Sequence, residues 1–185
     1  MSRIIKKFGK CNLQPHRDYF NALLQAIVGQ QLSVKSAAAI NGRLFEKFNN
    51  QPTPELIIAT KDDEFKKIGL SNAKIKYVKD LSARIINKEI SLKNFNKKSD
   101  EDIIAELTKV KGIGIWTSHM FLIFTLGRLN VLPYGDLGIK KAIMLNYNLR
   151  KLPDEQKVIK IAKKHNWAPY NSVAAWYLWK TLDSE

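Results

Sequence analysis

The chain has 185 residues, of which 45% are hydrophobic, so one domain or two small lobes with a real core can form. Its net charge of +14 predicts attraction to a polyanion: nucleic acid first, and an anionic membrane surface second. The longest apolar run, residues 120–126, is far too short to span a bilayer, there is no N-terminal signal pattern, and the single cysteine, Cys11, excludes an internal disulfide and a four-cysteine iron–sulfur cluster.

The first part of the chain is predicted to form helices after a basic, irregular arm over residues 1–14. Apolar residues at helical spacing run from Phe20 to Val28 and stop at the turn Gly29-Gln30-Gln31-Leu32. Ser33 stands where an N-cap is expected. The helix after it carries apolar residues at Val34, Ala37, Ala38, Leu44, Phe45 and Phe48.

The centre of the chain combines a hairpin, an apolar helix and a loop. Ser99, with an acidic residue three positions on, is a capping-box-like start of a helix that ends in the glycine hairpin 110–114. A nearly all-apolar helix is predicted over 115–126. A loop with Pro, Tyr and Gly at 133–135 then delivers one carboxylate, Asp136.

Helical patterns account for the rest of the chain. Thr53 and Ser71 are placed to begin two earlier helices, Asp154 begins another, and an aromatic-rich helix ends the chain. We find no convincing alternating pattern of a β-strand and no internal repeat. The sequence therefore predicts an all-α fold of about ten helices in two lobes.

The hairpin glycines would allow the backbone to approach an anion. Gly112 and Gly114 permit positive φ and carry no Cβ. The next helix begins at once, so its unpaired N–H groups and positive dipole end favour phosphate, and Lys109 and Lys111 add charge. The alternative is a plain helical hairpin with a glycine C-cap, which the two glycines alone would favour.

Asp136 has two interpretations. Aspartate is a preferred N-cap, and a helix is predicted directly after it. A carboxylate held rigidly at a helix start can also stabilise a developing cation and orient or deprotonate a water molecule. Both can hold at once.

Four segments resemble those of the helix-hairpin-helix DNA glycosylase superfamily, and most closely its alkylation-repair branch, 3-methyladenine DNA glycosylase II. They are GQQLS at 29–33, VKGIGIWT at 110–117, PYGDLGIK at 133–140 and AAWYLW at 174–179. The resemblance extends over about residues 19–182. It implies a single glycosylase domain, 1–185, with one contiguous lobe over about 29–126 and a second from about 1–28 plus 127–185.

The resemblance implies a site in a cleft between the lobes, with Asp136 at its mouth as the catalytic carboxylate. Bifunctional members carry a nucleophilic lysine at the position of Trp116, so a monofunctional hydrolase that uses water is expected here. The expected base pocket contains Trp116, Tyr134, Trp179 and Met120. Met120 departs from the family, which has an aromatic residue at this position.

The resemblance also implies contacts with duplex DNA. Gly112, Ile113, Gly114, Lys111 and Thr117 would contact phosphates. Gln30, Gln31 and Leu32 would enter the duplex as plug and wedge when a base is extruded, although the same turn could be an ordinary glycine turn with an inward-facing leucine. The carbonyls of Thr108, Val110 and Ile113 would form a backbone site for a monovalent cation.

The function implied is excision of alkylated bases, such as N3-methyladenine and N7-methylguanine, from double-stranded DNA by base flipping and hydrolysis. No organic cofactor, catalytic metal or membrane is needed. We expect a monomer, cytoplasmic and nucleoid-associated in a prokaryote or nuclear in a eukaryote, and not secreted. The alternatives are a glycosylase of this fold for other damaged or mismatched bases, or a non-enzymatic helix-hairpin-helix DNA-binding protein.

Overall fold

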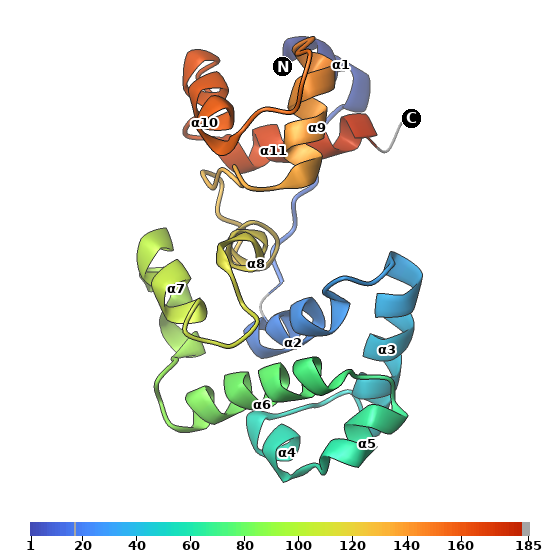
Figure 1. Cartoon of the computed structure of the whole chain (residues 1–185). Coiled ribbons are helices and arrows are strands. Elements are labelled where there is room, and N and C mark those ends of the chain that lie inside the picture. Colours follow the sequence, from blue (N-terminus) through green and yellow to red (C-terminus); the bar gives the residue numbers. More distant parts are fainter. Residues whose placement is uncertain (17, 183–185) are drawn as a thin grey trace. The chain divides into compact units, whose positions relative to one another are not determined.

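The computed structural model describes residues 1–16 and 18–182, and all the regular structure in them is helical, as predicted (Figure 1). Its elements are α1 (Ser2–Phe8), α2 (Tyr19–Gly29), α3 (Val34–Lys47), α4 (Pro54–Ala59), α5 (Asp62–Lys67), α6 (Asn72–Ile86), the 3-10 segment η1 (Leu92–Lys97), α7 (Asp100–Leu107), α8 (Ile115–Met120), the π-helical segment η2 (Phe121–Thr125), α9 (Leu137–Asn146), α10 (Glu155–Lys164) and α11 (Asn171–Leu182). Within the described residues, no helix has both the length and the apolar character that crossing a membrane requires.

The chain divides into two compact units, which we call the central unit, residues 18–118, and the end unit, residues 1–16 and 119–182. These boundaries differ from the sequence-based lobes at two places. The structure assigns α2 to the central unit because it packs against α3 and α6, whereas the sequence grouped it with the chain ends. Residues 119–126, expected in the contiguous lobe, belong to the end unit.

The core of the central unit is built around α6, which packs against both α2 and α4 (Figure 1). On α6 the fully or almost fully buried residues Ile75, Val78 and Leu81 recur every three positions, so they form one face of the helix. The N-caps predicted at Ser33, Thr53, Ser71 and Ser99 are confirmed, since each side chain accepts a hydrogen bond from the backbone N–H three residues on.

Helical spacing does not place every apolar residue of α3 in the core. Val34 is 89% exposed, and Ala38 is exposed as well. Val34 is the first residue of α3, directly after the Ser33 cap, and only Leu44 of this helix is fully buried. Apolar spacing therefore overstated how far the N-terminal turn of α3 enters the core.

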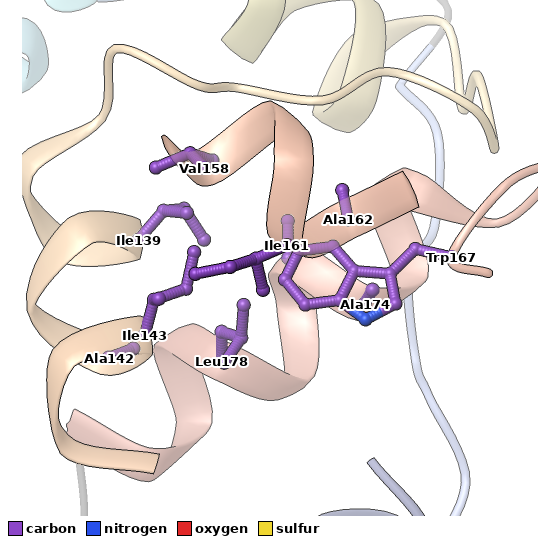
Figure 2. Close-up of a cluster of buried hydrophobic side chains, with 10 residues drawn as sticks. Ile139, Ala142, Ile143, Val158, Ile161, Ala162, Trp167, Ala174 and Leu178 are labelled. Atoms are coloured by element: carbon purple, nitrogen blue, oxygen red, sulfur yellow. The ribbon is translucent and has the colours of Figure 1, made fainter. Parts of the chain in front are cut away.

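The core of the end unit joins α9, α10 and α11 (Figure 2). Its side chains come from all three helices and the loop before α11: Ile139, Ala142, Ile143, Val158, Ile161, Ala162, Trp167, Ala174, Ala175 and Leu178. The prediction of an irregular arm over residues 1–14 is wrong for its first part, because Ser2–Phe8 form α1, which packs against α11. The hydroxyl of Tyr177 donates to the Gly9 carbonyl at 2.6 Å and holds the end of this helix.

Adjacent isoleucines on α4 provide a test of this packing. Ile57 is fully buried, whereas Ile58 is 41% exposed. Ile57→Ala removes buried methyl groups and leaves a cavity, so we expect unfolding to become easier by about 2–5 kcal/mol. Ile58→Ala is the control and should cost less than about 1 kcal/mol. Equal losses in chemical denaturation would contradict the buried position of Ile57.

Candidate functional site

The hairpin between α7 and α8 requires a glycine at position 112. Gly112 has φ +84°, a conformation that other residues rarely adopt. The ring of Tyr77 lies directly against it: a Cβ built at Gly112 would be 2.3 Å from Tyr77 Cδ2. Gly114 has no positive φ, and a Cβ there would meet nothing within 4 Å. The two glycines are therefore not equivalent, and only Gly112 is needed for the fold.

The hairpin is also held to α6 by a carboxylate. Asp80 Oδ2 accepts the backbone N–H of Lys111 at 2.9 Å and Arg84 Nε at 3.0 Å. The Lys111 amide thus has a partner within the protein. Burial by itself raises the pKa of Asp80, but these two hydrogen bonds and the charges of both basic residues hold that pKa below its usual range.

The sign of this pKa shift determines its effect on stability. The folded-state pKa of Asp80 lies below the unfolded value, which is about 3.9. Its ionised form therefore stabilises the fold at neutral pH. This stabilising contribution begins to be lost when the pH falls below the unfolded-state pKa of about 4. It is gone once the pH is below the folded-state pKa.

Neighbouring residues in the turn after α2 differ in their contacts and exposure. Gln30 Nε2 donates to the carbonyl of Gly112 at 2.7 Å, so the Gln30 side chain lies on the hairpin. Gln31 has φ +57° and is exposed, and Leu32 is 36% exposed. The inward-facing leucine of the alternative interpretation is not what the structure shows.

The remaining hairpin residues differ in burial. Ile113 and Thr117 are buried, and the Ile113 N–H donates to the Val110 carbonyl at 3.1 Å. Thr108 ends α7 as its C-cap. A monovalent cation at the carbonyls of Thr108, Val110 and Ile113 stays a prediction.

Asp136 is the N-cap of α9 and is held from two sides. Its Oδ1 accepts the Ile139 N–H at 2.7 Å and Trp179 Nε1 at 2.8 Å, and the residue is only 8% exposed. Gly138 permits this arrangement, because a Cβ there would lie 3.0 Å from Asp136 Oδ1 and 3.1 Å from Trp179 Cδ1. Capping alone explains the first bond. The second bond, from α11, fixes the carboxylate more rigidly than a cap requires.

Trp179, which bonds to this carboxylate, also takes part in an aromatic contact. The ring of Phe124 lies against Trp179, with 5.5 Å between the ring centroids. Tyr134 packs edge-on against the buried His119, at 5.3 Å between centroids. Met120 is partly buried in the same unit.

Sequence reasoning missed Phe124. Its spacing from Trp116 and Met120, eight and four residues along one helix, is the signal that could have indicated it. The π-helical segment η2 contains Phe124 and changes the helical period there. Trp116 itself belongs to the central unit and is 50% exposed, whereas Tyr134, Met120 and Trp179 belong to the end unit.

The family model that describes an HhH-GPD superfamily base excision DNA repair protein matches residues 24–167. The chain belongs to this superfamily, as the four motifs predicted. It is 36% identical to DNA-3-methyladenine glycosylase 1 of Schizosaccharomyces pombe, over 97% of this chain and 80% of that protein. It is 32% identical to the alkylbase DNA glycosidase-like protein mag2 of the same organism, over 97% of this chain and 86% of that protein.

A solved structure is similar along almost the whole chain. It is the 3-methyladenine DNA glycosylase of Schizosaccharomyces pombe in complex with abasic DNA, which superimposes with a TM-score of 0.86 at 35% identity. The alignment covers 97% of this chain and 89% of that one. The predicted superfamily and its all-α fold are therefore confirmed.

The two hairpin glycines provide a matched pair of variants. Gly112→Ala places a residue in a left-handed conformation and forces its Cβ into the Tyr77 ring, so we expect a loss of more than about 2 kcal/mol of stability. That corresponds to a fall in Tm of at least roughly 4 °C for a chain of this size. Gly114→Ala should leave Tm nearly unchanged. Similar Tm values for both variants would contradict the hairpin geometry.

Proposed function

We propose that this protein is a monofunctional DNA glycosylase that removes alkylated bases from duplex DNA. The observation that carries the proposal is the buried Asp136 carboxylate, held by two N–H donors beside the Trp179 and Phe124 rings. Two similar proteins are named as a 3-methyladenine glycosylase and an alkylbase glycosidase-like protein. The solved relative holds abasic DNA, and an abasic site is the product that this reaction leaves.

The chemistry is hydrolysis of the bond between the sugar C1′ and the base nitrogen. The base departs with the bonding electron pair, and the sugar becomes an oxocarbenium-like cation. Asp136 stabilises this cation through its negative charge and orients the attacking water, whose proton it accepts. Water adds at C1′, so the products are the free base and an abasic site.

The aromatic side chains suit a cationic base. N3-methyladenine and N7-methylguanine carry positive charge on the ring, and an indole face attracts a cation by roughly 0.5–2 kcal/mol. Trp179, Tyr134 and Met120, all of the end unit, are proposed to line the base pocket, and we add Phe124 of the same unit. A pocket role for Trp116 stays a prediction of the resemblance. Alkylation already weakens the glycosidic bond, so a single carboxylate is a sufficient catalyst.

DNA binding is proposed for the hairpin and the turn after α2. Gly112, Gly114 and Thr117 would meet phosphates through their backbone N–H groups, because the Thr117 side chain is buried, and Lys111 would contribute its side-chain charge. A monovalent cation at the carbonyls of Thr108, Val110 and Ile113 would add to the attraction for phosphate. We further propose that the protein binds duplex DNA as a monomer. The proposed reaction uses no organic cofactor and no catalytic metal.

The first test replaces Asp136 with asparagine. In Asp136→Asn the side-chain amide oxygen can still accept both hydrogen bonds, so the fold is retained while the negative charge is lost. We expect release of methylated purines from methylated duplex DNA to fall by about 100-fold or more. Binding to duplex DNA with an abasic site should persist.

Two outcomes would overturn this proposal. Equal release by the wild type and the variant would show that another group carries the reaction. Absence of release by the wild type, with DNA binding intact, would favour the non-enzymatic DNA-binding protein or a glycosylase for a different lesion.

A second test separates the two roles of Trp179. Trp179→Phe keeps an aromatic ring beside Phe124 but removes the N–H that donates to Asp136. Because hydrogen bonds to charged groups contribute about 1.5–3 kcal/mol, we expect the rate at saturating DNA to fall roughly 10- to 100-fold. Phe124→Leu is the control, since it removes a ring without touching the carboxylate; it should affect mainly the half-saturating DNA concentration. A Trp179→Phe variant with the wild-type rate would show that the indole N–H does not position Asp136.

A further inference from the structure

The contact between Gln30 and Gly112 joins the two elements of the central unit that are proposed to touch DNA. Gln30 is the C-cap of α2 and begins the turn after it, and Gly112 lies in the hairpin 82 residues further along the chain. The bond is short, with 2.7 Å between Gln30 Nε2 and the Gly112 carbonyl oxygen. It forms within the protein itself and needs no DNA.

Both elements are also anchored separately on α6. Lys74 Nζ donates to the Val28 carbonyl at 2.7 Å, next to the turn, where an ammonium group compensates the negative end of α2. Tyr77 lies under Gly112, and Asp80 accepts the Lys111 N–H. The turn and the hairpin thus rest on consecutive turns of one helix.

Gln30 is the direct connection between these two supported elements. Its neighbour Gln31 is exposed, with φ +57°, a left-handed conformation that brings the chain sharply around. Leu32 follows and is partly exposed. Adjacent residues of one turn therefore have different surroundings: Gln30 is partly buried on the hairpin, whereas Gln31 and Leu32 are more exposed.

From these contacts we propose that Gln30 is a positioning residue, which fixes the spacing between the turn and the hairpin before DNA binds. Gln31 and Leu32 are then the residues that enter the duplex. This inference rests on the proposed function. Within the GQQLS segment, residues 29–33, Gln30 is then the latch, meaning the residue whose hydrogen bond holds the turn against the hairpin. Gln31 and Leu32 are the pair that inserts into DNA.

The physical reason is preorganisation. Two binding elements whose spacing is already set lose less conformational freedom when both engage one ligand. Once the duplex is bound, its phosphates themselves hold the hairpin. Loss of the Gln30 bond should therefore weaken DNA binding. It should have little effect on the rate of base release once the protein is saturated with DNA. Loss of an inserted side chain should instead slow base extrusion in the bound complex.

The experiment first measures amide hydrogen exchange in the free protein. The reporters are the Lys111 and Ile113 amides, both hydrogen-bonded in the hairpin, with the Val78 amide in α6 as the internal reference. Gln30→Met keeps the side-chain length but removes the donor. One hydrogen bond of about 0.5–1.5 kcal/mol corresponds to exchange roughly 2- to 12-fold faster at the hairpin. Gln31→Ala is the matched control and should leave this exchange unchanged.

The second measurement uses methylated duplex DNA with the same two variants. Gln30→Met should raise the half-saturating DNA concentration several-fold with a nearly unchanged single-turnover rate at saturation. Gln31→Ala should lower that saturating rate. Unchanged exchange in Gln30→Met, or a fall in its saturating rate alone, would overturn the proposal and make Gln30 the inserted residue. Because exchange is measured without DNA, it tests the latch even if the protein does not release bases; absence of release by the wild type would count only against the proposed function.

Discussion

The candidate site depends on one constraint, the two hydrogen bonds that Asp136 Oδ1 accepts from Ile139 N–H and Trp179 Nε1–H. A carboxylate that is 8% exposed costs free energy unless donors replace its water. One donor is the backbone of α9 and the other is the indole of α11, so the carboxylate position is correct only when these two helices pack in register. The apolar cluster shared by α9, α10 and α11 enforces that register (Figure 2). The packing of the end unit therefore also sets the orientation of the proposed catalytic group.

In the central unit, helix α6 holds the backbone of the hairpin in place, as α9 and α11 hold Asp136 in the end unit. In the proposed function its hairpin presents backbone atoms to DNA. Backbone atoms have no side-chain rotamers of their own, so the residues behind the hairpin would set its position. Tyr77 and Asp80 of α6 supply a surface and an acceptor for this purpose. The absence of a Cβ at Gly112 lets the backbone lie directly on the Tyr77 ring. This close approach explains why one glycine of the motif is structurally necessary and the other is not.

Two features of the candidate site bear on the substrate range of the proposed function. An aromatic residue is expected by the resemblance at position 120, where this chain has methionine. Phe124, one helical turn further and within the π-helical segment, supplies a ring that packs on Trp179. A π-helical segment rotates the following residues relative to a regular helix, so a ring can be delivered from a different position of the sequence. This arrangement offers an apolar, electron-rich surface without matching the family residue by residue.

The sequence alone determined the local structure and the class of protein. N-caps at Ser33, Ser71 and Asp136 could be predicted because a cap is a contact between residues three apart. The four motifs indicated the superfamily because their residue types and order are specific, and Trp116 in place of a lysine could be read directly. Helix α1 and the exposure of Val34 were missed, since both depend on what packs against them. The bond from Trp179 to Asp136 spans 43 residues and that from Gln30 to Gly112 spans 82, and neither leaves a periodic pattern. Only the packing of distant helices decides which side chains meet, because such contacts form through the shared core and not through spacing along the chain.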